Sequence, residues 1–473
     1  LIFSHPDPEK SFRNNFGCHH SKFMLVGFPT GLRVIIHSAN YIPKDMHCMN
    51  QGVYMQDFPF KEDTGATSSS PFEDYLVKYI QTLLVHGGPA ADKTSAWPGR
   101  ARRYPNGSLA DILQLYDYSG AYGHLVATAP GYHRNEGISA WGHMRLRTLL
   151  QKEGPVFPSA LRQGGPGGGS RIICQFSSFA SVHGGQLNDL EESFSAGRGT
   201  DGQRLGDAEL EFVWPAVHEV RDSIEGYAAG GSMPGQKKIT SDPRVRDRLR
   251  LWSHGEEEPA TSFMQARRNV MPHIKTFTRC GRGNSKMAQQ VAWVLLTSSN
   301  ISRSAWGALQ KKGTQLFCCH WELGVLFTPR SLQAMRHRYS CSNITRRRLP
   351  VDLGLREKHK EAEEAEEEEE EEASTQESDP SPLVELRTTE VPDGDTASEA
   401  SEEGRWCTVP LPFQVPPKPY LPHSVPWHSD GVFTGDPDRY GRTSLSDVSV
   451  HETVVSQLRE IQRSFLSTQR DCP

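Results

Sequence analysis

Hydrophobic and polar positions in the first 130 residues predict three strands and two helices. Apolar side chains gather in short runs on either side of the turn residues Pro29-Thr30-Gly31, a pattern typical of two strands joined by a tight connection. After Ser70 and Pro71, apolar residues recur three and four positions apart, which indicates one face of a helix. The expected elements are strands over 22–26, 32–36 and 123–128, and helices from Pro71 to before Gly87 and over 109–116.

The pattern resumes after Pro130-Gly131, where we expect a domain boundary. From residue 353 to 404 the composition becomes acidic and rich in Ser, with ten Glu in the twelve residues 361–372. Like charges at this density repel one another, so this segment is expected to be disordered. The elements predicted outside it are strands over 171–176, 210–213, 273–278, 291–296 and 322–327, and helices over 141–151, 217–226, 450–465 and from Ser302 onward.

One short motif occurs twice. His20-Ser21-Lys22 is followed by a strand-like apolar run and Asn40, and 253 positions later His273-Ile274-Lys275 is followed by another such run and Asn300. Residues two apart in a strand point to the same side, so each His–Lys pair is expected to face one pocket. Two such halves would place two imidazoles, two ammonium groups and two amides around one anion, which suits a phosphate ester. A lone His is usually a packed or surface side chain, but the duplicated spacing favours a functional pair.

The formal net charge of −5 hides an uneven distribution. Residues 351–405 hold 21 Asp or Glu and 5 Lys or Arg, which leaves 36 acidic and 47 basic residues in the rest of the chain. A basic folded part favours an anionic partner such as nucleic acid or a lipid headgroup. Solvated surface charge alone would give the same balance.

Cysteine usage and hydropathy argue against several classes of protein. The nine Cys include no C-x-x-C pair, so no zinc motif is present. Their odd number without disulfide-like spacing suits a reducing compartment. No apolar run approaches the roughly 20 residues of a membrane span. The chain begins at Leu1, without Met and close to the first motif, so we expect it to lack the start of its first domain.

The duplicated motif resembles the signature of the phospholipase D superfamily, which usually adds an Asp a few residues after the Lys. Neither Lys22 nor Lys275 is followed by that Asp, and its absence is typical of one branch, the type I tyrosyl-DNA phosphodiesterases. Longer stretches are similar to the same branch: Gly17-Cys18-His19-His20-Ser21-Lys22, Gln175-Phe176-Ser177-Ser178, Met271-Pro272-His273-Ile274-Lys275-Thr276, Ser304-Ala305-Trp306-Gly307-Ala308-Leu309 and Trp321-Glu322-Leu323-Gly324-Val325-Leu326-Phe327.

The resemblance implies an α/β fold of two phospholipase D-like α-β-α sandwich domains, related by pseudo-two-fold symmetry, with the active site between them. The first domain would occupy 1–130 and be incomplete at its start, and the second would occupy 131–352. The acidic insertion at 353–404 would then separate the second domain from its C-terminal part at 405–440. A tail at 441–473 would follow, with one helix.

The resemblance also implies a role for each residue of the two motifs. His20 would attack phosphorus and form a covalent phosphohistidine, and His273 would protonate the leaving tyrosyl oxygen and then act as a base on water. Gln51 and Glu322 would orient the two imidazoles, and the sequence leaves open which residue serves which His. No metal or other cofactor is expected, because the non-bridging oxygens would be bound by Lys22, Lys275, Asn40 and Asn300.

For the substrate, the resemblance implies DNA whose 3′ end carries a tyrosyl peptide from topoisomerase I, on single- or double-stranded ends, with a 3′-phosphate as product. A monomeric DNA-repair enzyme without a membrane partner is expected, in the nucleus and also in the cytoplasm. The alternatives are a broader 3′-end-processing phosphodiesterase or nuclease and an inactive DNA-binding relic. The residues expected to contact the DNA are Phe16, Ser178, Ser181, Ser302 and Arg303. Without the resemblance, each of these Ser residues would be read as a helix cap or a turn residue.

Overall fold

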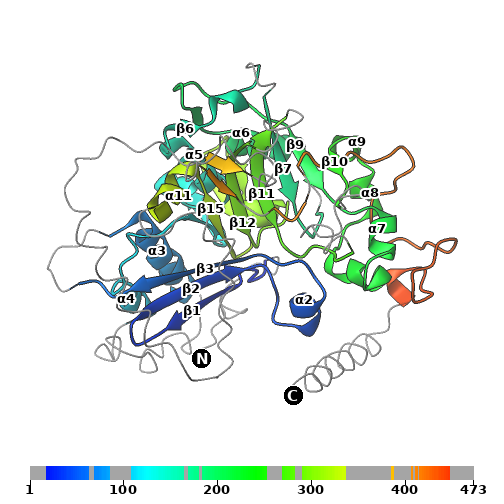
Figure 1. Cartoon of the computed structure of the whole chain (residues 1–473), viewed down its shortest axis with the longest axis horizontal. Coiled ribbons are helices and arrows are strands. Elements are labelled where there is room, and N and C mark those ends of the chain that lie inside the picture. The colour runs from blue at the N-terminus through cyan, green and yellow to red at the C-terminus, as the bar shows by residue number, and fades with distance from the viewer. Residues whose placement is uncertain are drawn as a thin grey trace, which may run out of the picture.

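A computed structural model shows a mixed α/β architecture in which the two motifs lie on two different sheets (Figure 1). No helix among the described residues is long and apolar enough to cross a membrane. The structure describes residues 17–62, 69–85, 108–164, 169–180, 184–252, 269–282, 290–336, 385–387, 406–408, 411–413 and 415–447.

The first motif precedes an antiparallel sheet of three strands in the order β1-β2-β3. The strands are β1 (Phe23–Gly27), β2 (Gly31–His37) and β3 (Val53–Pro59). The prediction of β1 and β2 is confirmed. β3 was not predicted, because buried and exposed residues alternate along the strand and the polar residues Gln56 and Asp57 interrupt its apolar pattern. The short helix α2 (Pro43–His47) lies between β2 and β3.

Helix α3 (Pro71–Val85) covers this first part of the chain and confirms the predicted helix. Its apolar stripe, which includes Tyr79, packs in one hydrophobic cluster with β2 and β3. Helix α4 (Leu109–Leu113) is shorter than predicted; it begins at a capping box between Ser108 and Asp111.

The second motif belongs to a sheet of nine strands, whose main path runs β10-β9-β7-β11-β12-β15-β4. Its centre, from β7 through β11 and β12 to β15, is antiparallel. At one edge, β9 pairs with β7 and β10 pairs with β9, both in parallel. In addition, β16 pairs with β12, and β17 pairs with β16. The strands are β4 (His124–Thr128), β7 (Ser170–Gln175), β9 (Leu210–Val213), β10 (Leu249–Arg250), β11 (Thr276–Gly281), β12 (Gln290–Thr297), β15 (Glu322–Phe327), β16 (Glu385–Arg387) and β17 (Trp406–Thr408).

Two hydrophobic clusters lie on opposite faces of the strand β4. Leu125 and Ala127 belong to the cluster around α3, whereas Val126 belongs to the cluster that contains α5 (Gly142–Lys152) and α6 (Gly184–Phe194). Figure 1 shows α5 and α6 at the top of the molecule and β1 to β3 at the bottom. A strand from the first 130 residues therefore completes the sheet of the second motif.

Short elements connect the sheets. The remaining strands are β5 (Gly131–Arg134), β6 (Pro155–Phe157), β8 (Arg198–Gly199), β13 (Ala308–Gln310) and β14 (Gln315–Cys318). The remaining helices are α7 (Val217–Arg221), α8 (Lys237–Thr240), α9 (Pro243–Arg246), α10 (Arg303–Trp306) and α11 (Pro329–Arg336), with 3-10 helices η4 (Asn135–Ala140), η5 (Ser159–Leu161), η6 (Gly226–Ser232) and η9 (Leu445–Asp447).

Three further predicted elements need correction. The strand expected at 273–278 begins only at Thr276. His273 and Ile274 instead donate their backbone N–H groups to the carbonyl of Asn50, which lies between β2 and β3. The helix from Ser302 ends at Trp306, since Gly307 adopts a φ of 83° and the chain enters β13. The helix expected at 217–226 stops at Arg221.

Helix α6 escaped prediction because it starts with Gly184-Gly185 and has few apolar residues. Within the segment expected to be disordered, residues 385–387 form β16; its other residues, and the helix expected at 450–465, lie outside the described ranges.

Candidate active site

Two reciprocal backbone pairings bring the motifs together. The N–H of His20 donates to the carbonyl of Trp321 (2.9 Å), and the N–H of His273 donates to the carbonyl of Asn50 (2.9 Å). Each motif therefore pairs with a segment from the other part of the chain. Gly52 permits this approach, because a Cβ there would lie 2.5 Å from the side chain of Leu296.

The first imidazole is held by a carboxylate from the second half of the chain. Nδ1 of His20 lies 3.0 Å from Oε2 of Glu322, which is almost fully buried, whereas the His20 side chain is 22% exposed. Burial lowers the pKa of His20, although Glu322 raises it. A neutral His20 that donates from Nδ1–H to Glu322 keeps a lone pair on Nε2. This state suits a nucleophile.

Glu322 is held in turn by two further groups. The Ser298 hydroxyl donates to the same carboxylate, and Nδ1 of His320 lies 3.4 Å from its other oxygen. Burial alone would raise the pKa of Glu322, but the contacts with His20 and His320 hold it below its usual range. The carboxylate beside His20 therefore remains charged.

The second imidazole is buried more deeply. Its Nδ1–H donates to the carbonyl of Ser38 (3.0 Å), and Oδ2 of Asp45 lies 3.2 Å from the same nitrogen. The His273 side chain is 8% exposed. Burial and the positive charges of Lys275, Lys22 and His20 lower its pKa to about 2. These influences show that both imidazoles and both ammonium groups act on one another within one site.

The two lysines repeat the same local geometry. Nζ of Lys22 donates to the carbonyl of His20 (2.7 Å), and Nζ of Lys275 donates to the carbonyl of His273. An ammonium group has three N–H donors, so each lysine keeps two for another acceptor. Burial lowers the pKa of both lysines, and that of Lys275 falls well below its ordinary value.

The two asparagines are also anchored. Oδ2 of Asp45 accepts from both the backbone N–H and the Nδ2 group of Asn40 (2.8 Å each). Oδ1 of Asn300 accepts from the backbone N–H of Ser177 (3.1 Å). Each amide group thus retains an N–H that can donate to a ligand.

Buried cations repel one another unless an anion joins them. Lys22, Lys275 and the two imidazoles share one partly enclosed site, whose acidic neighbours are Glu322 and Asp45. A phosphodiester between the two imidazoles would favour the charged forms of both lysines and accept the spare N–H groups. The arrangement is therefore suited to binding a phosphate ester.

The sequence left open which residue serves which imidazole, and the structure places Glu322 against His20. Gln51 touches the surroundings of the second imidazole: its Nε2 donates to the backbone carbonyl of Asp45 (3.0 Å), and its Oε1 accepts from the hydroxyl of Ser38 (2.7 Å). Gln51 therefore supports the two groups that approach His273.

The residues expected to contact DNA occupy mixed positions. Ser302 caps α10, because its hydroxyl accepts from the N–H of Ala305 (3.1 Å). Arg303 is exposed beside it, and Ser178 is partly exposed after β7. Phe16 and Ser181 lie outside the described residues.

Asp45 and Ser38 were missed from the sequence. Asp45 follows Pro43 at the start of a short helix, where an acidic residue is ordinarily explained by the helix dipole. The role of Ser38 in the site belongs to its backbone carbonyl, which no residue type reveals. Within the described ranges, no group of three or more His, Cys, Asp or Glu side chains could hold a metal ion.

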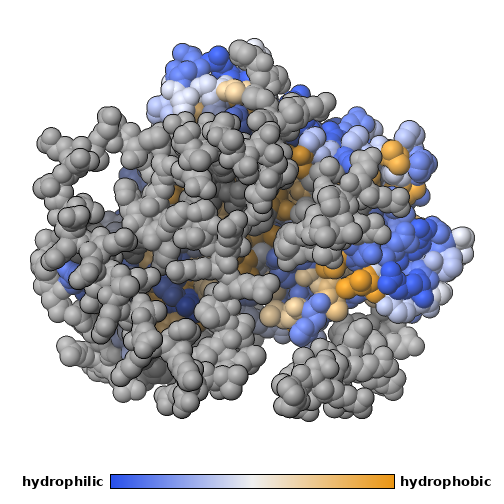
Figure 2. All heavy atoms as spheres, in the orientation of Figure 1, coloured by the Kyte–Doolittle hydropathy of each residue, from blue (hydrophilic) through white to orange (hydrophobic). Residues whose placement is uncertain are grey.

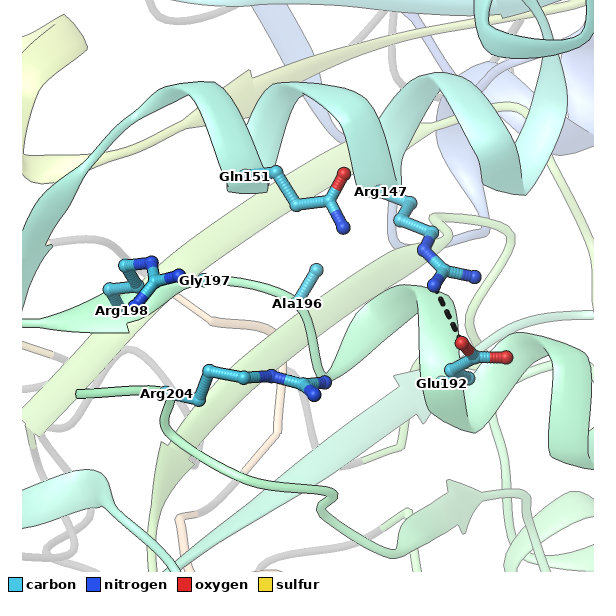
Figure 3. A pocket seen from close by; sticks show the side chains of 7 residues that line it. All are labelled: Arg147, Gln151, Glu192, Ala196, Gly197, Arg198 and Arg204. Atoms are coloured by element: carbon cyan, nitrogen blue, oxygen red, sulfur yellow. Dashed lines mark hydrogen bonds and ion pairs between the residues drawn. The ribbon is translucent and has the colours of Figure 1, made fainter.

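A separate basic pocket of about 390 Å³ lies between α5, the end of α6 and β8 (Figure 3). Ser195, the neighbour of its lining residue Ala196, accepts from the guanidinium of Arg279 near the end of β11. His273 lies before the other end of the same strand, so the pocket is distinct from the site. Its lining residues are Arg147, Gln151, Glu192, Ala196, Gly197, Arg198 and Arg204.

Two His–Lys–Asn sets that meet in one site on a mixed α/β scaffold are the defining features of the phospholipase D superfamily. A model of the tyrosyl-DNA phosphodiesterase family matches residues 9–421. The chain belongs to this family.

Relatives in plants and animals share its sequence to different degrees. Tyrosyl-DNA phosphodiesterase 1 of Arabidopsis thaliana is 35% identical over 429 residues, which cover 90% of this chain and 61% of the plant protein. Tyrosyl-DNA phosphodiesterase 1 of Drosophila melanogaster is 27% identical over 331 residues, which cover 67% of this chain and 50% of the fly protein. The chain thus spans between half and two thirds of the length of these relatives.

A crystal structure of the yeast tyrosyl-DNA phosphodiesterase is also similar, with a TM-score of 0.46 and 15% identity over 67% of this chain and 69% of that chain. This similarity is too low to carry an argument, so the family membership rests on the sequence.

Proposed function

We propose that this protein hydrolyses the phosphodiester that joins a tyrosine of a topoisomerase I peptide to the 3′ end of DNA, and that it leaves a 3′-phosphate. The contact between Nδ1 of His20 and the buried Glu322 carries the proposal. It presents a neutral imidazole with a free Nε2 beside two ammonium groups, which is the state that a nucleophile at phosphorus requires. Family membership supports the tyrosyl leaving group.

In the first step, Nε2 of His20 attacks phosphorus and a P–N bond forms. The bond between phosphorus and the tyrosyl oxygen breaks, and His273, which carries a proton on both ring nitrogens once the phosphodiester is bound, gives its Nε2 proton to that oxygen. The spare N–H groups of the two lysines and two asparagines bind the non-bridging oxygens, where charge accumulates in the transition state. A positioned acid of this kind contributes roughly 10²–10⁴-fold.

In the second step, water replaces the histidine. Nε2 of His273, now neutral, takes a proton from the water, whose oxygen attacks phosphorus while the P–N bond to His20 breaks. The two imidazoles therefore keep separate roles through both steps, and His273 alternates between acid and base.

The peptide would lie over α2, on the side of His273. Asp45 places this helix beside His273, and three large side chains around it are half exposed: Tyr41 (57%), Ile42 (47%) and Met46 (56%). Figure 2 shows hydrophobic residues beside α2 on a face that is largely hydrophilic over α7 to α9. An apolar surface on the leaving-group side suits the side chains that flank a tyrosine.

The DNA would lie on the opposite side, near Ser178, Ser302 and Arg303, with Phe16 and Ser181 as further contacts. The duplicated site further supports two phospholipase D-like sandwich domains related by pseudo-two-fold symmetry, with boundaries expected near residues 130 and 352, although β4, which precedes residue 130, pairs with β15 of the second sheet. DNA as the substrate places the protein in the nucleus.

The test is a single-stranded oligonucleotide that carries a 3′-phosphotyrosine, incubated with the purified protein in EDTA. Release of tyrosine with a 3′-phosphate product is expected, because the proposed chemistry uses no metal. A ladder of cleavage products from unmodified DNA would instead show a broader nuclease. Binding of the oligonucleotide without turnover would show an inactive DNA-binding protein.

A further inference from the structure

We propose that Asp45 is the counter-ion of His273: its carboxylate stabilises the imidazolium that protonates the leaving group, while the Ser38 carbonyl fixes the tautomer. The proposal rests on the proposed function, in which His273 is the acid. Asp45 is thus a positioning residue that acts through His273.

Asp45 is held rigidly for this task. Asp45 is 1% exposed. Its Oδ2 accepts two hydrogen bonds from Asn40 at 2.8 Å and lies 3.2 Å from Nδ1 of His273. Behind it, Gln51 donates to its backbone carbonyl. The neighbouring Lys44 reaches across to the carbonyl of Ala228 (2.6 Å) and ties α2 to η6.

Glu322 both accepts the Nδ1–H of His20 and supplies a negative charge beside it. For His273, these two tasks are divided between Ser38 and Asp45. The Nδ1–H of His273 is directed at the Ser38 carbonyl (3.0 Å), which is a neutral acceptor. Asp45 lies beside this bond and supplies the charge. Removing only the charge of Asp45 should therefore leave the tautomer of His273 intact.

A counter-ion is needed because of what else faces this imidazole. Lys275, Lys22 and His20 all act on it with positive charge, and together with burial they keep it neutral in the empty site. Asp45 also favours the charged forms of both lysines. Asp45 is the carboxylate in contact with His273, whereas Glu322 contacts His20, so Asp45 joins the substrate phosphate in making an imidazolium possible. An opposite charge within 4–6 Å typically moves a pKa by about 1–3 units.

The decisive experiment compares two leaving groups in single-turnover kinetics. One oligonucleotide carries a 3′-phosphotyrosine, whose oxygen needs a proton as it leaves, and the other carries a 3′-(4-nitrophenyl) phosphate, whose leaving oxygen is a much weaker base. We expect Asp45→Asn to slow tyrosine release about 10- to 100-fold and nitrophenol release by less than about 3-fold. The high-pH limb of the tyrosine profile should also move to lower pH by about one unit or more.

Two control variants separate this role from loss of geometry. Glu322→Gln should slow both substrates by a similar factor, because it acts on the nucleophile. Asn40→Ala removes the amide that Asp45 holds and should also slow both substrates alike. Equal loss of both substrates in Asp45→Asn, with an unmoved pH limb, would overturn the proposal.

A titration independent of turnover completes the test. Histidine NMR with inorganic phosphate bound should give a lower pKa for His273 in Asp45→Asn than in the unsubstituted protein, and an unchanged pKa would overturn the proposal. If Asp45→Asn does not fold, Asp45→Ser is measured with and without formate, which should restore tyrosine release. If the unsubstituted protein turned over neither substrate, the proposed function would fail, and the titration would still decide the role of Asp45.

Discussion

The two His–Lys–Asn sets have the same residue types and very different surroundings. His20 precedes a three-stranded sheet and is 22% exposed, whereas His273 precedes the central strand β11 of a nine-stranded sheet and is 8% exposed. The lysines follow the same order, with Lys22 8% exposed and Lys275 fully buried. The more open imidazole can reach a phosphorus atom, whereas burial and the neighbouring cations keep the deeper one neutral in the empty site. Position therefore separates the roles that the residue types leave equal.

The carboxylates sharpen this contrast, because each comes from the opposite half of the chain. Glu322 follows the second motif and holds His20, and Asp45 follows the first motif and approaches His273. Neither half holds a complete catalytic set. Either half of the chain, expressed without the other half, should therefore be inactive.

The largest effect should come from removing the nucleophile. His20→Ala should lower the rate of tyrosine release by roughly 10⁴-fold or more, because it removes the imidazole that is presented for attack on phosphorus. Denaturing gels of the reaction should show no protein–DNA adduct. A residual rate within about 10-fold of the unsubstituted protein would mean that His20 is not the nucleophile.

Removing the acid–base should leave a different trace. His273→Ala should slow tyrosine release by roughly 10²–10⁴-fold and slow attack of water on the phosphohistidine as well. A covalent adduct should therefore persist and be visible as a shifted protein band that disappears after mild acid treatment. If neither this variant nor His20→Ala formed an adduct, the assigned roles would be wrong.

The lysines should separate activity from stability. Lys22→Met and Lys275→Met should each lower the rate by roughly 10²–10³-fold, because each removes a donor to the developing charge. The fully buried Lys275 costs most to keep charged, so Lys275→Met should leave the thermal midpoint unchanged or raise it. A large fall in the midpoint for Lys275→Met alone would contradict this reading of its burial.

Acid should weaken the fold through His273. Its pKa of about 2 in the folded protein lies below the ordinary value of 6.5, so the unfolded chain binds the extra proton. The stability linked to His273 is therefore complete above pH 6.5 and is lost as the pH falls below it, by about 2 kcal/mol at pH 5. His273→Asn should lose less unfolding free energy than the unsubstituted protein between pH 7 and 5, measured by urea denaturation at each pH.

The smallest effect should come from the surface of α2. Ile42→Ser with Met46→Ser should slow release of a tyrosine embedded in a peptide a few-fold and leave release of a single tyrosine unchanged. Arg204→Gln, in the separate basic pocket, serves as the matched surface control and should affect neither substrate. If the α2 substitutions changed the rates on both substrates by the same factor, the peptide would not bind to this face.

Much of the local structure could be predicted from spacing alone. The strands β9 and β15 begin and end at the predicted residues, and α3 follows its stripe of apolar residues. β3, whose apolar run is interrupted by Gln56 and Asp57, was not predicted, because alternation over a few residues is a weak signal beside a continuous apolar run.

The sequence by itself determined the residue types of the site, since a duplicated His–Lys–Asn spacing is independent of how the chain folds. It also indicated the family, because the motif lacks the usual Asp in both copies. Only the tertiary structure decided which imidazole meets which carboxylate. Glu322 is 302 positions from His20, and no local pattern relates residues that far apart. Asp45 and the Ser38 carbonyl became part of the site only when the pairing of His273 with Asn50 carried the second motif to the first, since electrostatic contacts depend on distance in space.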